Sequence, residues 1–398
     1  MIEWKKKKVN ELIEHKSGYT WSKDQEENTP SSKDSIRVLT VTNIQKELND
    51  EYKLYLKKVK KKDKLEKKVT KNWIIMVTSN GNRDRIGNAI FIDRDMEVLF
   101  ASFLGAFKPL NENYLIPKYF YYWINQCSVQ KRITSVAEGT TGLGNMNLRY
   151  FKSMEVFYPD KSTQEKIASI LSTIDKNIEQ TKKTIEKVEK LTKSMMQNLL
   201  TGKIKPDGTK RRDDEFYIDE KFGKVPKDWD KGKAKDFFVL QRGYDLPDSQ
   251  VKNGKYPVVM SNGVNIYHNE YKEIGPGVIT GRSGSIGNVN YINSNYWPHN
   301  TSLFIKDFKN NFPKFVYYYL QFMHLERLLA GTSVPTLNRN DVHRIKITFP
   351  RNNEQKQIAK ILDLIINEIR NLDLKILKLQ KLKKSLMQNL LTGKIEVK

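Results

Sequence analysis

Two pairs of loops in this chain carry side chains suited to reading the edges of DNA bases. One pair, residues 78–85 and 280–285, follows apolar stretches, and the other pair is residues 139–147 and 331–339. Arginine and asparagine side chains can each make two parallel hydrogen bonds to a guanine or an adenine, and glycine lets the backbone approach a ligand closely. An ordinary turn is the commoner role for any one of these residues. As a set that occurs in matching places of both halves, the loops predict DNA recognition.

The candidate DNA-contacting residues are polar and basic side chains in and beside these loops. We expect them to contact bases and phosphates in each half of the chain. In the first half they are Ser79, Asn80, Asn82, Arg83, Arg85, Thr140, Thr141, Asn145, Asn147 and Arg149. In the second half they are Arg242, Tyr244, Asn262, Arg282, Ser283, Ser285, Thr332, Ser333, Thr336, Asn338 and Arg339.

Catalytic motifs do not accompany these loops. The pairs Gly202-Lys203 and Gly393-Lys394 lack the upstream glycine and the hydroxyl residue of a phosphate-binding loop. The sequence has neither the Asn-Pro-Pro-aromatic tetrapeptide of amino-methyltransferases nor a Gly-x-Ser-x-Gly nucleophile elbow. We therefore expect no catalytic residue, metal ion or cofactor site in this chain. The five histidines, none with metal-ligand spacing, are His15, His268, His299, His324 and His343.

The chain is long and strongly basic. Its 398 residues can form two domains with proper cores, and its formal net charge is +24. Such a field favours a polyanion, above all nucleic acid, although a lysine-rich surface without a ligand is an alternative. Residues 53–71 hold ten lysines against Asp63 and Glu66, as a solvated run or a phosphate-contacting segment. A membrane partner is disfavoured because no apolar run could span a bilayer and no signal-peptide core begins the sequence.

The cysteine content indicates the redox environment. Cys127 is the single cysteine, which excludes an internal disulfide and makes the reducing cytoplasm the expected location. Because Cys127 lies next to an aromatic helical run, we expect it to be a small buried hydrophobic residue.

The sequence is internally duplicated. Residues 164–204 and 355–395 align without a gap at an offset of 191 residues (355 − 164), and both copies end in MQNLLTGKI. A period this long indicates a duplicated half-molecule rather than a solenoid unit. The segments before the two copies repeat more loosely, and matched residues include Trp4 with Trp229 and Gly18-Tyr19 with Gly243-Tyr244.

Both repeated segments predict long helices. Apolar residues recur at steps of four and three from Ile167 to Leu199 and from Ile358 to Leu390, which places them in one coiled-coil seam. We expect about 38 residues in each helix, a length of roughly 57 Å. The simplest arrangement pairs the two seams antiparallel, and the alternative is a separate coiled coil of each helix with another protein.

Particular residues mark the ends of these helices. Ser162 and Glu165 predict a capping box at the start of the first helix. Gly202 and Gly393 follow the helices where a left-handed residue is needed.

One seam position is polar in both helices. Thr192 and Lys383 occupy it, so we expect the seam to weaken there or to shift to Leu191 and Leu382.

The segments in front of the long helices predict α+β domains. Short β-rich stretches alternate with turns rich in Gly, Asn and Pro. Each half also holds an aromatic helix, near residues 117–132 and 313–329, and then a last strand before the long helix.

Several motifs resemble the specificity (S) subunit of type I restriction–modification systems. They are residues 350–359 (PRNNEQKQIA), residues 225–230 (VPKDWD) and the two MQNLLTGKI endings. The first copy departs slightly, with TQE at residues 163–165 where the second has EQK at 354–356. The resemblance spans essentially the whole chain.

The residues and the resemblance together imply an α+β fold. Two pseudo-symmetric α+β target-recognition domains would be joined by two long α-helices that form an antiparallel coiled coil. The expected boundaries are 1–160 for the first target-recognition domain, 161–204 for the first helix, 205–350 for the second domain and 351–398 for the second helix.

The resemblance also implies a function and a set of partners. The chain would be a non-catalytic DNA-recognition subunit that binds a bipartite, asymmetric site on double-stranded DNA. It would assemble with two methyltransferase (M) subunits and two restriction (R) subunits, which bind S-adenosylmethionine, ATP and Mg²⁺. The alternatives are a DNA-modifying enzyme that acts alone and a coiled-coil scaffold without a DNA role.

Overall fold

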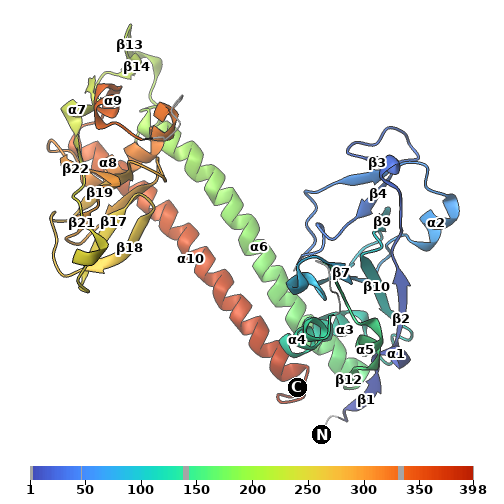
Figure 1. The fold of residues 1–398 in the computed structure, drawn as a ribbon. Coiled ribbons are helices and arrows are strands. Elements are labelled where there is room, and N and C mark those ends of the chain that lie inside the picture. The colour runs from blue at the N-terminus through green and yellow to red at the C-terminus, as the bar shows by residue number, and fades with distance from the viewer. Residues whose placement is uncertain (1–2, 46, 138–142, 330–335, 398) are drawn as a thin grey trace. The chain divides into compact units, whose positions relative to one another are not determined.

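The computed structural model describes residues 3–45, 47–137, 143–329 and 336–397 (Figure 1). Within this described part of the chain, no helix is both long enough and apolar enough to cross a membrane. Four of the candidate DNA-contacting residues lie outside it: Thr140, Thr141, Thr332 and Ser333.

The chain forms two compact units, each with its own α+β region. Unit 1 comprises Met1–Thr181 and Lys375–Lys398, and unit 2 comprises Lys182–Leu374. Two long helices are shared between the units, α6 (Lys161–Leu200) and α10 (Asn352–Leu390). Each unit therefore contains one part of each long helix.

Unit 1 is built on a four-stranded antiparallel sheet in the order β2-β10-β6-β8. A second sheet has the order β3-β5-β4-β9, and two strand pairs are β1 with β12 and β7 with β11. The strands are β1 (Lys5–Lys8), β2 (Ile13–Ser17), β3 (Glu26–Glu27), β4 (Ile36–Leu39), β5 (Leu54–Leu56), β6 (Ile74–Val77), β7 (Ser79–Asn80), β8 (Ala89–Phe91), β9 (Val98–Phe100), β10 (Leu104–Pro109), β11 (Gly144–Asn145) and β12 (Glu155–Tyr158). The helices in front of α6 are α1 (Val9–Leu12), η1 (Lys23–Gln25), α2 (Lys61–Glu66), η2 (Arg83–Arg85), α3 (Pro117–Ile124), α4 (Cys127–Ser135) and α5 (Leu148–Ser153).

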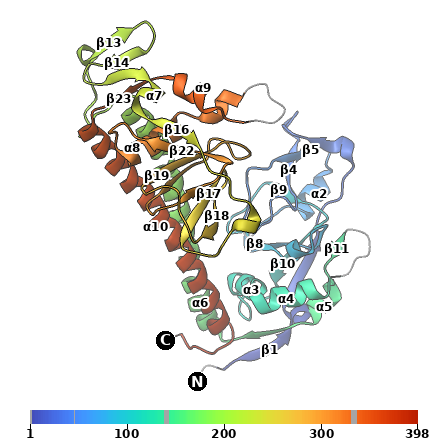
Figure 2. The same ribbon diagram turned by 60° about the vertical axis from the view of Figure 1, so that its left-hand side comes forward.

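Unit 2 repeats the main sheet in the order β16-β22-β19-β20, again antiparallel. A three-stranded sheet β18-β17-β21 accompanies it, and both views show the β13–β14 hairpin projecting from the unit (Figures 1 and 2). The strands are β13 (Phe216–Asp219), β14 (Gly223–Pro226), β15 (Asp230–Lys233), β16 (Val239–Arg242), β17 (Tyr256–Met260), β18 (Gly263–His268), β19 (Gly277–Gly281), β20 (Val289–Ile292), β21 (Trp297–Pro298), β22 (Ser302–Asp307) and β23 (Lys346–Phe349, paired with β15). The helices in front of α10 are η3 (Asp213–Glu215), α7 (Ala234–Phe237), η4 (Asp248–Gln250), α8 (Pro313–Phe322), η5 (Leu325–Leu329) and α9 (Arg339–Arg344).

The repeated residues of the sequence make the same contacts in both units. A Cβ atom on Gly18 would lie 2.0 Å from the carbonyl oxygen of Ala101, and one on Gly243 would lie 2.1 Å from that of His299. Only glycine fits where two backbones approach so closely. This explains why a Gly-Tyr pair survives at both places, and the internal duplication is confirmed.

A buried glutamine at the start of each long helix is duplicated as well. The Gln164 side-chain oxygen accepts a hydrogen bond from the Ile116 amide at 2.9 Å, and Gln355 accepts one from the Phe312 amide at 2.8 Å. Each bond satisfies a backbone N–H at the beginning of an aromatic helix, α3 or α8, whose first-turn amides have no partner within the helix. The shared QEKIA and QKQIA stretches thus fasten each long helix to its α+β region.

The antiparallel pairing of α6 with α10 is confirmed at both ends of the helices. In unit 1, Ile167 and Leu171 from the start of α6 share a core with Leu390 from the end of α10. In unit 2, Leu199 from the end of α6 shares a core with Ile358 from the start of α10. The start of each helix therefore packs against the end of the other, through the seam that the apolar period predicts.

The seam does not shift at its polar position, so of the two expected outcomes, weakening or a shift to Leu191 and Leu382, the shift is excluded. Leu191 and Leu382 are 53 % and 48 % exposed, whereas Thr192 is 8 % exposed. The Thr192 hydroxyl donates a hydrogen bond to the Val188 carbonyl at 2.7 Å, so it stays in the seam with its polar group satisfied within the helix.

Lys383 keeps the seam position in unit 1 because it has a partner there. Its Nζ lies 2.6 Å from Asp175 Oδ1 and 5.5 Å from the centre of the Tyr122 ring. The Tyr122 hydroxyl donates to the other oxygen of Asp175 at 2.8 Å. This small polar cluster replaces an apolar layer of the seam, and one member comes from each helix and one from α3.

Two local predictions were wrong. The cap of α6 is Asp160 rather than a Ser162–Glu165 box: its carboxylate accepts bonds from the Thr163 amide at 3.0 Å and hydroxyl at 2.8 Å. Cys127 is exposed rather than buried, because it is the first residue of α4 and that helix buries its Val129 and Ile133 side instead.

The C-terminal caps are confirmed. Gly202 and Gly393 adopt φ values of +69° and +72°, the left-handed conformation that glycine adopts most readily.

Candidate nucleic-acid interface

In unit 1, the two predicted loops lie side by side. Strand β7 pairs with β11, so Asn80 faces Gly144 and Ser79 faces Asn145. The Ser79 hydroxyl donates to Asn145 Oδ1 at 2.6 Å, and Ser79 is only 7 % exposed while Asn145 is exposed. Ser79 therefore fixes the side chain of Asn145, which is the member of the pair that faces outward.

The loop after β7 is shaped by its own asparagines. Asn80 Oδ1 accepts from the Asn82 amide at 2.8 Å, and Asn82 Oδ1 accepts from the Asp84 amide at 3.0 Å. Side chains that bond the backbone two residues ahead are typical of tight turns. These two turns hold η2 in a position that leaves Arg83 exposed.

Arg85 differs from Arg83 in its contacts. Its guanidinium is half-buried and donates to the backbone carbonyls of Val41 and Ile44, the latter at 3.3 Å. These bonds fasten the loop to the segment that follows β4. Arg85 is thus placed to support the loop, with its donors directed into the protein.

The second loop of unit 1 leads into a short helix. Asn147 caps α5 by accepting a bond from the Tyr150 amide at 2.9 Å, and Arg149 is exposed in the first turn of that helix. Asn147 thus orients the exposed turn of α5 that carries Arg149.

A hollow of about 430 Å³ opens beside these loops, and the sequence did not point to it. Phe103 lies in the wall of the hollow and is 48 % exposed. The pKa of His15 is lowered, mainly because the side chain is buried and also because Lys152 and Lys67 are positively charged. An exposed aromatic side chain next to a basic loop is the feature that could have indicated it. The lining residues are His15, Ser17, Thr78, Ser79, Ser102, Phe103, Leu104, Asn145, Met146 and Leu148.

Unit 2 brings its own two loops together in the same way. Ser283 forms an isolated antiparallel bridge with Thr336, whereas Ser79 and Asn145 belong to the antiparallel β7–β11 strand pair of unit 1. The Arg282 amide donates to the Thr301 carbonyl at 2.9 Å, and its carbonyl accepts from the Leu337 amide at 2.8 Å. The backbone of Arg282 is thus fixed from both sides while its side chain is half-exposed. Ser285, farther along the loop, is exposed.

The cap at the second loop is also duplicated. Asn338 Oδ1 accepts from the Asn340 amide at 2.9 Å and begins α9, and Arg339 is exposed in its first turn. Asn147 and Asn338 are related by the repeat offset of 191 residues (338 − 147). The duplication thus preserves the residue that orients this turn.

Three further candidates in unit 2 have different surroundings. Arg242 lies 3.4 Å from the carboxylate of Asp245, at the exposed end of β16. Asn262, in the exposed β17–β18 turn, accepts a bond from the Asn265 side chain at 2.6 Å. Tyr244 donates its hydroxyl proton to Glu273 at 2.8 Å, and burial and then Glu273 raise its pKa, so its polar group is engaged within the unit.

The lysine-rich segment is partly engaged with unit 1. Lys64 and Lys67 donate to the backbone carbonyls of Asp34 and Ser17 at 2.7 and 2.8 Å, and Lys68 lies 3.2 Å from Glu97. These bonds hold α2 against the unit. Other lysines of the segment remain exposed and keep their predicted role in phosphate contact: Lys53, Lys58, Lys60, Lys61, Lys62 and Lys71.

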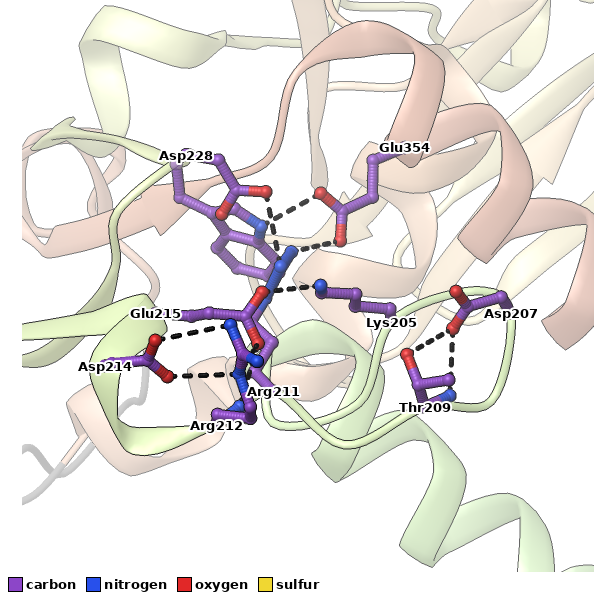
Figure 3. A network of polar contacts seen from close by, with 10 residues as sticks. Lys205, Asp207, Thr209, Arg211, Arg212, Asp214, Glu215, Asp228 and Glu354 are labelled. Carbon is purple, nitrogen blue, oxygen red and sulfur yellow. Dashed lines mark hydrogen bonds and ion pairs between the residues drawn. The ribbon is translucent and has the colours of Figure 1, made fainter.

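A buried arginine connects the segment between the two halves to α10 (Figure 3). Arg211 is 8 % exposed, and its Nη1 and Nη2 lie 3.2 Å from Asp228 and 2.7 Å from Glu354. Its guanidinium also lies 5.9 Å from the centre of the Trp229 ring, and the Trp229 indole N–H donates to Glu354 at 3.1 Å. Burial outweighs the adjacent guanidinium and raises the pKa of Glu354. The cluster joins three parts of unit 2: the segment that holds Arg211, the segment that holds Asp228 and Trp229, and the start of α10 at Glu354.

Comparisons with known proteins place these features in a family. The model of the type I restriction modification DNA specificity domain matches residues 1–190 and 226–380. The chain is 26 % identical to a putative type I restriction enzyme MjaX specificity subunit of Methanocaldococcus jannaschii, over 81 % of this chain and 79 % of that protein. It is 24 % identical to the MjaIX specificity subunit of the same organism, over 71 % of this chain and 70 % of that protein.

Solved structures show the same fold. The S subunit of a type I restriction–modification system from M. genitalium superimposes with a TM-score of 0.63 at 20 % identity, covering 98 % of this chain and 96 % of that one. A chain from a structure of type I R-M complex assembly and conformational transition gives a TM-score of 0.58 at 12 % identity, covering 98 % of each chain. With the family model matched in both halves, the chain belongs to the DNA specificity subunits of type I restriction–modification systems.

Proposed function

We propose that this chain recognises a bipartite, asymmetric DNA site, with one half read by each unit. The observation that carries the proposal is the duplicated loop pairing, Ser79–Asn145 in unit 1 and Ser283–Thr336 in unit 2. The scaffold of the two loops is alike, whereas the side chains they present differ. Two readers with one design and different contact residues suit two different half-sites.

Exposed and half-exposed side chains would make the base contacts, while the formal net charge of +24 supplies phosphate affinity. In unit 1 we assign base contacts to Arg83, Asn145 and Arg149, which are exposed. In unit 2 we assign them to Arg282 and Arg339. Ser79 and Arg85 would instead hold the reading loops of unit 1 in place, and the hydroxyl of Tyr244 would stay bonded to Glu273 within unit 2.

The long helices would fix the gap between the half-sites and bind the partner subunits. Their faces away from the seam are largely polar, yet they expose several leucines, among them Leu364 (62 %) and Leu377 (53 %). Exposed leucines on otherwise polar helices suit contact with further helices. We assign these faces to two methyltransferase subunits, with two restriction subunits in the full complex.

The chemistry would belong to those partners. The methyltransferase subunits would bind S-adenosylmethionine and methylate an adenine in each half-site, and the restriction subunits would use ATP and Mg²⁺. The chain described here would supply the sequence information and the geometry, on DNA in the cytoplasm.

Methylation mapping after a domain exchange tests the proposal. Residues 1–158 are replaced by the corresponding residues of a relative, and host DNA is mapped for methylated adenines with the natural and the exchanged gene. We expect one half-site to change while the other half-site and the gap stay the same. Change in both half-sites, or in neither, would contradict reading by separate units. Binding of S-adenosylmethionine to the purified chain alone would favour an independent modifying enzyme instead.

A further inference from the structure

Phe103 lies in the turn between β9 and β10 and is bonded to the loop of residues 78–85. Its carbonyl oxygen accepts hydrogen bonds from the amides of Thr78 and Ser79, at 2.9 and 3.2 Å. Ser79 in turn fixes the side chain of Asn145. The turn is therefore fastened to the loop by its backbone, and the Phe103 side chain lines the same hollow of about 430 Å³ as Asn145.

The hollow has an apolar part that Phe103 forms with its neighbours. Leu104 and Met146 are buried and Leu148 is half-buried, whereas Phe103 is 48 % exposed. Single exposed apolar residues are common, so exposure alone indicates no function. Phe103 is informative because of its place beside Asn145, to which a base contact is assigned above. A ligand group that covers Phe103 there must be apolar to gain from the contact.

Positive charges lie beside this hollow. Lys67 donates from its Nζ to the carbonyl of Ser17, a lining residue, at 2.8 Å. Burial and then the charges of Lys152 and Lys67 lower the pKa of His15, another lining residue, so both ammonium groups act on this part of the wall. Among the described residues that line the hollow, none is acidic. These charges attract the phosphates of DNA.

Unit 2 has a matching turn with Thr301 in place of Phe103. The Thr301 carbonyl accepts from the amides of Arg282 and Ser283 at 2.9 and 3.2 Å, the same two distances as at Phe103. The two residues therefore occupy equivalent positions behind their loops, although their side chains differ in size and polarity.

The turn of unit 2 is engaged within its own unit. The Thr301 hydroxyl accepts from the Ser261 amide at 3.3 Å and lies 3.0 Å from His299 Nδ1. The preceding residue, Asn300, donates to the carboxylate of Asp245. An apolar side chain is thus presented beside the loop in unit 1, whereas hydrogen-bonded polar side chains stand there in unit 2.

The groups that DNA displays decide what Phe103 can contact. In the major groove, base edges present hydrogen-bond donors and acceptors and one apolar group, the C5-methyl group of thymine. Arg83 and Asn145 suit the donors and acceptors. The Phe103 ring carries no polar atom, so the thymine methyl group is the part of a base edge that it contacts favourably.

We propose that Phe103 is a specificity-determining residue of unit 1 and reads the C5-methyl group of a thymine. The methyl group lies against the Phe103 ring in the hollow, while Asn145 contacts a base edge beside it. Methyl reading by this turn is confined to the half-site of unit 1, because Thr301 is bonded within unit 2. The inference rests on the proposed function and adds to it a residue and the chemical group that this residue reads.

Replacement of thymine by deoxyuridine tests the contact on the DNA, because deoxyuridine lacks only the C5-methyl group. The domain exchange described above identifies the half-site of unit 1, and each thymine in its two strands is replaced in turn. The full-length chain, assembled with the methyltransferase subunit of its system, is titrated with these duplexes in competition with the unmodified site. We expect about fourfold weaker binding for replacement at one position, the loss predicted for one buried methyl group.

Phe103→Ala tests the same contact on the protein, because it removes the ring and keeps the carbonyl that holds the loop. This variant should bind thymine and deoxyuridine equally well at that position and should leave the half-site of unit 2 unchanged. Phe157→Ala is the matched control and should keep the difference. Phe157 is 47 % exposed and lies in the wall of a separate hollow of unit 1, which Trp4 and Gln126 also line. Thermal unfolding of both variants checks the fold, and the deoxyuridine series with the natural chain requires no variant.

The outcomes separate this inference from the proposed function. A half-site of unit 1 without thymine, or one in which no deoxyuridine weakens binding, would overturn the role of Phe103 while the proposed function stands. A preference for thymine that Phe103→Ala retains would also overturn it, because another residue would then read the methyl group. If the assembled natural chain binds the mapped site no better than unrelated DNA, the proposed function fails together with the inference.

Discussion

Trp229 in unit 2 and Trp4 in unit 1 occupy equivalent places in the duplication but have different surroundings. Trp229 is covered by Arg211 and bonded to Glu354, whereas Trp4 lies in the wall of a hollow. The sheets beneath them have the same strand order, and the caps Asn147 and Asn338 are alike. Duplication has thus preserved the internal frame, and the two units diverge in the segments that surround the equivalent tryptophans.

The largest expected effect comes from breaking the closed site of unit 2. Arg211→Ala would leave Asp228 and the half-buried Glu354 without their cation. Removal of one partner from a fully buried pair costs about 3–5 kcal/mol, so at this partly exposed site we expect a loss of about 3 kcal/mol of unfolding free energy. Denaturant unfolding followed by tryptophan fluorescence measures it. Arg212→Ala is the control, because the Arg212 side chain is 76 % exposed and should change stability little. Equal effects of the two substitutions would show that the buried cluster does not stabilise unit 2.

Base recognition by unit 2 can be compared with that by unit 1 through Arg282. If its half-exposed guanidinium makes a paired contact to a guanine, Arg282→Ala should relax one base position by about 1–3 kcal/mol and leave the other half-site unchanged. Competition binding with single-base variants of the mapped site measures this. A uniform loss over all sequences would mean that Arg282 contacts phosphate.

The polar seam position allows a second test of how the units differ. Lys383→Met removes the cation beside Asp175 in unit 1, and loss of a hydrogen bond to a charged group costs about 1.5–3 kcal/mol. Lys384→Met, at an exposed position one residue away, is the control. Chemical unfolding should show a loss of stability for Lys383→Met alone. If Lys383→Met is as stable as the control, the lysine contributes no more to the seam than an apolar side chain does.

The two duplicated caps should contribute similar amounts to the free energy of unfolding. Asn147→Ala and Asn338→Ala each remove a side-chain acceptor at a helix start, for which about 1 kcal/mol is typical. We expect similar losses of stability, with methylation at one half-site impaired by Asn147→Ala and at the other by Asn338→Ala. Impairment of the same half-site by both substitutions would break the correspondence between the units.

The smallest effect concerns pH. Hydrogen bonds from the Thr163 hydroxyl and then its amide hold the pKa of the Asp160 carboxyl below its ordinary value. Its contribution to stability is therefore present above the unfolded-state pKa near 3.8 and is lost as pH falls toward the folded-state pKa. Unfolding of the natural chain and of Asp160→Asn between about pH 5 and pH 2.5 should show a steeper loss for the natural chain. Identical slopes would mean that the cap does not titrate in this range.

The long helices and the duplication could be predicted because their information is local. A seam from Ile167 to Leu199 repeats over many turns, and a second copy at a constant offset confirms each position independently. The shift to Leu191 was wrong because the pattern does not show that Thr192 can bond its own helix and that Lys383 meets Asp175. Polar side chains that make such contacts can occupy seam positions, even where hydrophobicity alone predicts that a neighbouring leucine would take the position.

The candidate site was harder to read for a similar reason. Residue type suggested base contacts for Arg85 and Tyr244, but their partners lie 41 and 29 residues away in the sequence. No local pattern reports those bonds. The hollow at Gln126 is formed by segments near residues 4, 123–132, 155–157 and 391–392, so it exists only after folding. The loops themselves could still be predicted, because their occurrence at matching places in the two halves can be seen in the sequence without knowledge of contacts between distant residues.

The ion pair between Asp175 and Lys383 has a consequence for assembly. The repeat places Thr192 at the position of Lys383, so a first half that met a copy of itself would set Asp175 opposite a hydroxyl instead of an ammonium group. A carboxylate without a cation in a helix seam is costly, and this cost selects against pairing of like halves. Charge therefore favours pairing of the first half with the second half over pairing of the first half with a copy of itself.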